Sequence, residues 1–405
     1  MAAAAGTFGA VLASYSAFRP IRDALILDGD PDRIPWLFTA TFVVALALAP
    51  VWGRLVARGP RHVVPLAFHG FALCALGFAA ASHAELAPVL VGRVFYVWSA
   101  VFNLFVVSVL WSLLADLLGH ATARRLYGPI AAGGTVGTFV GPLLTQALVG
   151  GIGVAGILVV SAALLELAAL GVISVRRAAR RLNAGGRDDD ERIDRPVAGG
   201  AFDGLTHVAR SPYLRSIVGY VLCTSCAATF VYLAQAHIAK DLLPDRLART
   251  ELFASIDIWV AVATFAVQIA LAGPLVGLLG PGLVLCALPV VQGVGIAALA
   301  VAPSLAVLVG VAIAGRTATH GLTRPARELL FTVLDRDDKY RAKNVIDTVA
   351  YRFGDLASSW LGEALGAAGA LVMTVATLPL VAGWLALATA LGAGFRRRVI
   401  AKDAT

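Results

Sequence analysis

Apolar runs long enough to cross the hydrocarbon core of a bilayer as one helix, about 20 residues, recur along the whole chain. Short polar stretches separate them, and their ends are soft. The pattern predicts twelve spanning helices rather than a soluble fold. The predicted spans are 2–18, 34–52, 63–82, 87–115, 127–149, 152–175, 214–236, 252–279, 281–301, 303–322, 342–369 and 371–393.

The composition agrees with this pattern. Of the 405 residues, 59% are hydrophobic and only 14% are charged, and the mean hydropathy is +0.81. Two soluble domains would also fit this length, but they would not need so many uncharged runs. The first run lacks the basic start and cleavage site of a signal peptide, so we expect it to be retained.

The longest polar stretch, residues 176–213, divides the predicted spans into six and six. It contains NAGGRDDDERIDRP at 183–196, with both charge signs, Gly and Pro, which is typical of a solvated linker. We therefore expect a six-helix bundle at 1–175, a charged cytoplasmic linker at 176–213 and a second six-helix bundle at 214–405.

The two halves also resemble each other. Pro-Asp-Arg follows the first span at 31–33 and the seventh span at 244–246. Repeated halves around a central linker are the layout of the major facilitator fold. The sequence GRLVARGPR at 53–61 resembles the loop motif of that fold, although Ala57 replaces its usual acid. The expected fold class is all-α integral membrane, with about twelve transmembrane helices in a 6+6 major-facilitator-like arrangement.

The glycines of the fifth span allow two interpretations. Gly128, Gly137, Gly141 and Pro142 follow the spacing of a facilitator antiporter motif. Glycines at four-residue intervals are equally typical of close packing between membrane helices.

Basic residues are unevenly distributed between alternate loops. If the N-terminus is cytoplasmic, the inner loops carry 21 Lys and Arg residues and the outer loops carry seven. The positive-inside rule then places both termini on the cytoplasmic side of the membrane. We expect this membrane to be a bacterial inner membrane. The basic residues behind the formal net charge of +8 mainly set this orientation. We therefore expect the protein to contact membrane lipid and not to bind nucleic acid.

Motifs of soluble catalysis are missing from the sequence. It contains no P-loop, no G-x-G-x-x-G after a strand, no H-E-x-x-H and no G-x-S-x-G. The four cysteines all fall inside predicted spans, where small apolar packing residues are the expected interpretation. We expect neither an enzyme nor a bound cofactor or metal.

Residues 315–355 place basic groups where the tenth and eleventh spans approach or enter the membrane. Ionisable groups at that depth are costly and usually line a substrate or ion path. Arg316, His320 and Arg324 are spaced to share one helix face, and Arg327 follows beyond a proline. Because Arg suits phosphate and carboxylate groups, this face predicts an anionic substrate. The alternatives are a helix displaced toward the cytoplasm, and His320 as a proton-sensitive group.

A second charged group ends the first span. Arg19 and Arg22 would form a cationic mouth for an anion, with Asp23 orienting one of the two guanidinium groups. The alternative is that both arginines extend from the helix end into the lipid headgroups.

Other charged residues are candidates for gating or coupling. Asp116 would pair with Arg124 or Arg125 across a cytoplasmic turn, unless the pair is an exposed contact of little energy. Arg352 and Asp355 form either an internal pair or a substrate contact. Further coupling candidates are Asp257 and Glu363.

Aromatic residues near these positions are candidates for stacking on a purine base. They are Trp36, Tyr96, Trp98 and Trp111. The competing interpretation is an aromatic belt at the membrane interface.

Three segments resemble one family. They read YSAFRPIRDAL at 15–25, WSLLAD with ARRLYGPIAAGG at 111–134, and RPARELLFTVLD with KYRAKNVID at 324–347. They resemble the nucleotide transporter (ATP/ADP translocase) family of plastids and intracellular bacteria, within or near the major facilitator superfamily. Members of that family are twelve-span exchangers, and many of them exchange ATP for ADP.

The resemblance implies roles for individual residues. Arg22 and Arg327 match functional Lys positions, and Asp116 and Glu328 match functional Glu positions. A basic turn and its following acid are matched by Arg341, Lys343 and Asp347. The segment FVYLAQAH at 230–237 departs from the family because it lacks an acid, and this leaves the substrate and the exchange chemistry open.

We therefore expect a secondary transporter that works by alternating access on an anionic, phosphorylated metabolite, acts as a monomer and has nucleotide exchange as its leading candidate activity. The alternatives are a proton-coupled facilitator of a drug, lipid or organic anion, and a membrane sensor or scaffold that does not transport. The predicted substrate-binding residues are Arg19, Arg22, Arg316, His320, Arg324 and Arg327. The predicted coupling or gating residues are Asp23, Asp116, Glu328, Asp347, Arg352 and Asp355.

Overall fold

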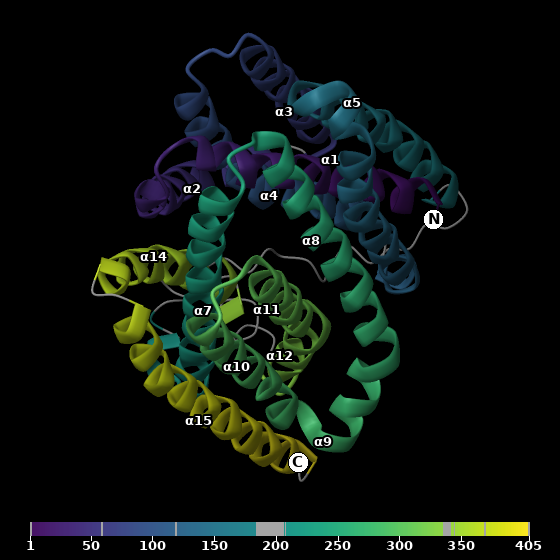
Figure 1. Cartoon of the computed structure of the whole chain (residues 1–405). Coiled ribbons are helices and arrows are strands. Elements are labelled where there is room, and N and C mark those ends of the chain that lie inside the picture. The colour runs from purple at the N-terminus through teal and green to yellow at the C-terminus, as the bar shows by residue number, and fades with distance from the viewer. Residues whose placement is uncertain are drawn as a thin grey trace. The chain divides into compact units, whose positions relative to one another are not determined.

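The structure, a computed structural model, describes residues 2–57, 60–117, 120–183, 206, 208–334, 342–343, 345–367 and 370–403. Within these ranges every regular element is a helix (Figure 1). The elements are α1 (Ala2–Leu25), η1 (Ile26–Asp28), η2 (Pro31–Arg33), α2 (Ile34–Ala57), α3 (Pro60–His83), α4 (Pro88–Leu117), α5 (His120–Asn183), α7 (Pro212–Leu242), α8 (Arg246–Val267), η3 (Gln268–Ala272), α9 (Gly273–Leu285), α10 (Ala287–Val301), α11 (Leu305–Thr317), η4 (Ala318–Thr323), α12 (Arg324–Leu330), η5 (Val345–Ala350), α14 (Tyr351–Ala367) and α15 (Ala370–Asp403).

Eight helical segments of the described residues are long and apolar enough to span a membrane. Two of them are too long for one crossing, because Leu126–Ala178 has 53 residues and Arg246–Leu285 has 40. A 53-residue helix would measure about 80 Å against a hydrocarbon core of about 30 Å. Each of these segments therefore has to contain more than one predicted span.

Two glycines break these long segments. Gly153 has a φ of 68° and Gly280 a φ of 74°, a left-handed conformation that glycine adopts without steric cost. Gly153 lies at the predicted boundary between the fifth and sixth spans, and Gly280 lies at the boundary between the eighth and ninth. The structure thus breaks the helices where the hydrophobic pattern separates the spans.

The chain forms two compact units. The first comprises Met1–Asp189 with Leu243–Ala261, and the second comprises Asp190–Leu242 with Val262–Thr405. The segment Leu243–Ala261, which lies in the second predicted bundle, thus groups with the first half of the chain. Helix α5 continues to Asn183, into the predicted linker, and most of the remaining linker lies outside the described residues.

Helix α1 of the first unit packs against α4 and most extensively against α5 (Figure 1). Glycines make the contact with α5 possible. A Cβ atom added to Gly141 would lie 2.5 Å from the carbonyl oxygen of Ala13, and one added to Gly137 would overlap the backbone of Gly9. The glycine spacing of the fifth span therefore serves close helix packing.

Buried hydroxyls join the same two helices. The Ser14 and Ser161 hydroxyl oxygens are 2.7 Å apart, and the Thr145 hydroxyl donates to the Ala17 carbonyl at 2.6 Å. These bonds satisfy polar groups that have no water to bond with at this depth. They fix the register of α1 and hence the position of its charged end.

The second unit has its own core, to which α7, α9, α10, α12 and α15 contribute. Trp384 is fully buried and packs edge-on against Tyr220, with ring centroids 5.7 Å apart. The Tyr220 hydroxyl donates to the Leu285 carbonyl at 2.8 Å, and the Tyr213 hydroxyl donates to the Leu330 carbonyl at 3.0 Å. Tyrosines on α7 thus join three other parts of this unit.

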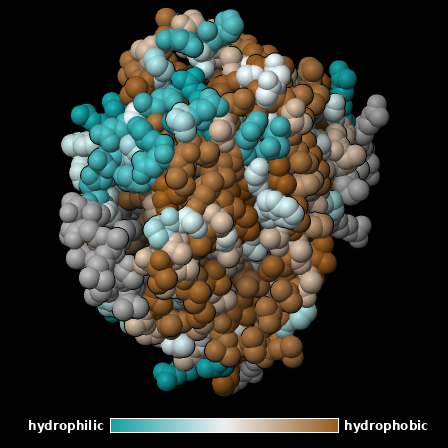
Figure 2. Space-filling model, viewed as in Figure 1, coloured by the Kyte–Doolittle hydropathy of each residue, from teal (hydrophilic) through white to brown (hydrophobic). Residues whose placement is uncertain are grey.

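Much of the outer surface is apolar. Figure 2 shows broad hydrophobic areas on the face in view, and exposed side chains include Leu66, Leu73, Leu278 and Val301. Soluble proteins rarely expose continuous apolar areas of this kind. The surface is that of a multi-pass protein whose helices face lipid.

We expect Gly137→Ala to destabilise the protein and Gly150→Ala to have little effect. The Cβ of the first variant meets the backbone of α1, and the second has nothing within 4 Å. Overpacking of this kind costs about 1–3 kcal/mol, so the melting temperature in detergent should fall by several degrees for Gly137→Ala only. Equal melting temperatures for the two variants would contradict the close packing of α1 on α5.

Candidate functional site

The charged end of α1 holds one guanidinium between an acid and an aromatic ring. Arg22 donates from Nε and Nη2 to Asp23 Oδ1, at 2.9 and 2.7 Å. Its guanidinium carbon lies 5.2 Å from the centre of the Tyr96 ring of α4. Both charged side chains are largely buried. The predicted role of Asp23, orienting an arginine, matches this geometry.

Arg19, one helical turn before Arg22, has a different partner. Its Nη2 atom lies 3.5 Å from Asp257 Oδ1, on α8. The Asp257 side chain is 8% exposed and the Arg19 side chain is 28% exposed. The arginines of the predicted cationic mouth are therefore each paired with a carboxylate.

Most of the aromatic residues that the sequence suggested for stacking on a base are part of the core of the first unit. Trp98 stacks on Phe95 with an interplanar angle of 20° and also contacts Phe18. Trp111 lies edge-on between Phe8 and Tyr127. Trp36, in contrast, is 62% exposed, as a residue of an interfacial belt would be.

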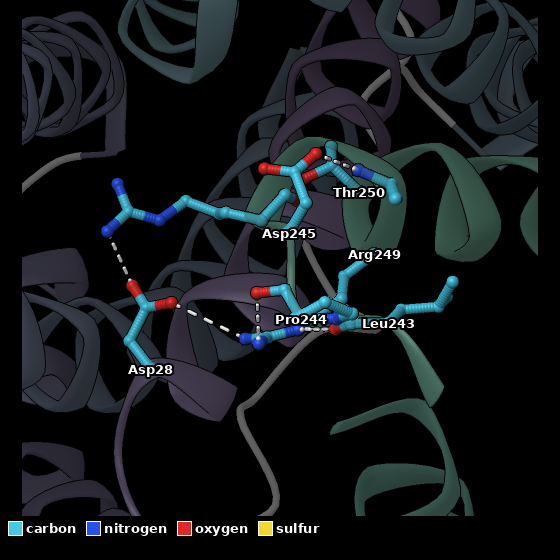
Figure 3. Close-up of polar contacts among 8 residues, drawn as sticks. Asp28, Leu243, Pro244, Asp245, Arg249 and Thr250 are labelled. Carbon is cyan, nitrogen blue, oxygen red and sulfur yellow. Dashed lines mark hydrogen bonds and ion pairs between the residues drawn. The ribbon is translucent and has the colours of Figure 1, made fainter. Parts of the chain in front are cut away.

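A second ionic cluster joins the segment after α1 to the start of α8 (Figure 3). Asp28 pairs through Oδ2 with Arg246 at 2.7 Å and through Oδ1 with Arg249 at 3.4 Å. The buried Arg249 guanidinium also donates to the carbonyl oxygens of Leu243 at 2.6 Å and Pro244 at 2.8 Å. One guanidinium thus binds a carboxylate and two backbone carbonyls of the segment between α7 and α8.

The sequence did not identify this cluster as a site. Its signal was the repeated Pro-Asp-Arg at 31–33 and 244–246, which placed both segments after corresponding spans. That repeat suggested equivalent positions but gave no reason to join Asp28 to Arg249. Only the packing of Leu243–Ala261 within the first unit does so.

In the second unit the predicted basic face is not a regular α-helix. Residues 318–323 form a π-helix, η4, between α11 and α12. Arg316 and His320 are half-buried, Arg324 is exposed and Arg327 is buried. Arg316, His320 and Arg324 thus differ in exposure, and their position on one shared face stays a prediction.

The π-helix is itself held by a polar contact. Gln268, in the π-helix η3, donates from Nε2 to the His320 carbonyl at 3.1 Å. Short π-helical segments are rare and often occur at functional sites. Pro325 is the second residue of α12, in the first turn, where proline is tolerated.

Arg327 repeats the arrangement around Arg22. Its guanidinium carbon lies 5.4 Å from the centre of the Tyr351 ring, and its Nη2 lies 3.9 Å from Oε1 of the adjacent Glu328. Glu328 in turn pairs with Lys343 at 2.5 Å. In each unit an arginine thus lies over a tyrosine and is followed by an acid.

Asp355 is hydrogen-bonded to the Ser225 hydroxyl of α7, and Arg352 lies one turn before it on α14. Gly354 allows this approach, since a Cβ added there would lie 2.8 Å from Ser225 Cβ. The side chains of Asp116 and Asp347, together with all of Arg341, lie outside the described residues. Their predicted roles stay predictions.

Within the described ranges the structure has no group of three His, Cys, Asp or Glu side chains arranged to hold a metal ion. The chemistry available at the charged sites is that of guanidinium groups. They bind anions through charge and directed N–H donors.

Comparison with known proteins identifies the family. The model of the Major Facilitator Superfamily matches residues 2–330. The chain belongs to the major facilitator superfamily. The helices and their lipid-facing surface are those of a transporter fold.

Two relatives of this facilitator are named "ADP,ATP carrier protein 1", from Chlamydia trachomatis serovar D and from Chlamydia muridarum. Each is 25% identical over 227 residues. The match covers 50% of this chain and 43% of each carrier, so it spans less than half the length of these relatives. The resemblance to nucleotide carriers is therefore confirmed as a distant similarity.

Solved structures of facilitators share the fold. The nucleoside transporter NupG superposes with a TM-score of 0.67 at 11% identity, over 100% of this chain and 98% of that one. A bacterial homolog of the human lysosomal transporter Spinster gives 0.66 at 15%, over 97% of both chains. A bacterial homologue of the iron transporter ferroportin gives 0.62 at 13%, over 98% and 96%.

We expect Asp28→Asn to destabilise the facilitator by about 3–5 kcal/mol, because it leaves a buried guanidinium without its carboxylate. The matched control is Asp30→Asn, which keeps the cap that Asp30 provides to the Asp32 N–H. The melting temperature in detergent should fall for the first variant only.

The double variant Asp28→Asn with Arg249→Gln should recover part of that loss, since it removes both charges together. A single variant as stable as the wild type would show that the cluster contributes nothing to folding.

Proposed function

We propose that this facilitator is a secondary active transporter of an anionic, phosphorylated metabolite, with ATP/ADP exchange as the leading candidate activity. The observation that carries the proposal is Arg22. Its largely buried guanidinium is held by Asp23 and lies over the ring of Tyr96. A cation fixed in this way at the end of a spanning helix costs stability, and binding an anion there offsets that cost.

The shape of the group favours phosphate. A guanidinium is planar and presents N–H donors in pairs, which match two oxygens of one phosphate group. Asp23 would keep the Arg22 guanidinium oriented while the incoming anion binds to it. Arg19 lies one turn away on the same helix and would contact a second acidic group of a di- or triphosphate.

Similarity to the two ADP,ATP carriers supports nucleotides over other phosphorylated compounds. Because this similarity is distant and covers half of the chain, it supports the substrate class more strongly than the exact pair of substrates. The fold of the nucleoside transporter NupG is compatible with such a substrate but does not select it.

In the proposed cycle, residues 1–175 and 214–405 change their mutual arrangement so that the site opens to one side of the membrane at a time. The facilitator would act as a monomer in the bacterial inner membrane. In the second unit Arg327 stays a predicted anion ligand, and Glu328 and Asp355 stay its predicted partners.

The test is exchange in proteoliposomes loaded with ADP. We expect external labelled ATP to enter the wild-type vesicles and Arg22→Gln to reduce the rate by about 10- to 100-fold, the value of a charged hydrogen bond. The matched control, Arg33→Gln, removes an exposed arginine near the same end of the first span and should exchange at the wild-type rate.

Other results would redirect the proposal. Uptake that follows a pH gradient and ignores nucleotides would favour a proton-coupled facilitator. A folded protein without flux for any solute would leave a sensor or scaffold.

Topology provides a separate test. The excess of basic residues in alternate loops predicts cytoplasmic termini. A C-terminal fusion to green fluorescent protein should fluoresce in bacterial cells, and a fusion to alkaline phosphatase should be inactive. The reverse pair of results would contradict the proposed orientation.

A further inference from the structure

Asp257 is a buried carboxylate that faces the charged end of α1. It lies on α8 and its side chain is 8% exposed, and Oδ1 is 3.5 Å from Arg19 Nη2. Near its start α8 is held by the Asp28 cluster. A hydrogen bond of 3.1 Å from the Ser255 hydroxyl to Gln146 Oε1 joins α8 to α5. Asp257 is thus positioned by contacts on both sides of it.

We propose that Asp257 is the resident counter-anion of Arg19, and that an acidic group of the transported anion binds by displacing it. This inference rests on the proposed function. It adds a carboxylate that competes with the substrate for Arg19. The substrate would compete with a carboxylate of the protein for one guanidinium.

The two ion pairs of α1 differ in a way that supports this assignment. Asp23 is adjacent to Arg22 on the same helix and makes short, directed hydrogen bonds of 2.7 and 2.9 Å. Asp257 belongs to another helix and approaches Arg19 to only 3.5 Å, beyond the usual length of a charged hydrogen bond. Partners on separate helices can move apart, whereas neighbours in sequence cannot.

Electrostatics explains why an exchangeable carboxylate is useful there. A guanidinium largely removed from water needs an opposite charge when no substrate is bound. Asp257 supplies that charge in the empty protein, and the substrate supplies it in the loaded protein. Arg19 is therefore neutralised in both states, and only one of the two anions can occupy the position.

Competition gives a prediction opposite in sign to that for a supporting residue. Neutralising Asp257 removes the competitor, so the anion should bind more tightly while the empty protein becomes less stable. We expect Asp257→Asn to bind ATP about tenfold more tightly, which corresponds to one charged hydrogen bond. A residue that only supported the fold would weaken binding when it is lost.

The experiment uses the full chain, purified in detergent, with ATP, ADP, inorganic phosphate and uncharged adenosine as probes in isothermal titration calorimetry. Asp257→Asn should lower the dissociation constant for the three anions and leave the response to adenosine unchanged. The control Asp245→Asn removes an acid that caps α8 at the Ala248 N–H, a role that Asn fills equally well. It should bind ATP as the wild type does.

Two further variants keep the proposal testable. In an Arg19→Gln background, Asp257→Asn should no longer raise affinity, because the two side chains act through one pair. Asp257→Glu should lower ATP affinity, because a carboxylate that reaches further competes more strongly. This second variant also serves if Asp257→Asn does not fold.

The outcomes separate this inference from the proposed function. A folded wild-type protein that binds none of the anions overturns the proposed function and this assignment with it. Wild-type binding of ATP that is unchanged or weakened in folded Asp257→Asn overturns the assignment alone. Tighter binding by Asp257→Asn that persists in the Arg19→Gln background also overturns it.

Discussion

A guanidinium group withdrawn from water has to be neutralised close by, and this requirement organises the polar parts of the facilitator. Arg19, Arg22, Arg249 and Arg327 all have a carboxylate as neighbour. In two of the four cases an aromatic ring covers the cation as well. Such charges are costly in an apolar protein. A buried ion pair therefore either stabilises the fold or takes part in binding a ligand, and its geometry indicates which. The Arg249 group is bound by a carboxylate and two backbone carbonyls, which is typical of architecture, whereas Arg19 has a loosely held partner on another helix.

Helix packing determines where these charges lie. The glycines of α5 allow α1 to approach backbone to backbone, and the Ser14–Ser161 and Thr145–Ala17 contacts fix its register. A helix held this tightly carries its last turn, with Arg19, Arg22 and Asp23, to a fixed position beside α4 and α8. The small residues of the fifth span thus help to determine where the charged residues of the first span lie. Their spacing fits both an antiporter motif and close packing. In this structure the close packing holds α1 against α5.

In the second unit local backbone geometry accompanies close packing. The π-helix at 318–323 rotates the residues after it relative to those before it. Beyond it Arg327 is buried over Tyr351 and Arg324 is exposed. The contact from Gln268 to the His320 carbonyl joins two π-helical segments.

The sequence by itself determined the membrane class, the spans and the places where long helices break, because runs of apolar residues and single glycines act locally. It also identified Arg22 and Asp23 as charged residues at the end of the first span, and the predicted contact between Asp23 and an arginine is present. The tertiary structure alone decided which charges meet. Asp28 with Arg249 and Arg19 with Asp257 are more than 200 residues apart, and no periodicity connects them. The π-helix at 318–323 was likewise not predicted, because the pattern of apolar and polar residues does not distinguish an α-helix from a short π-helical segment.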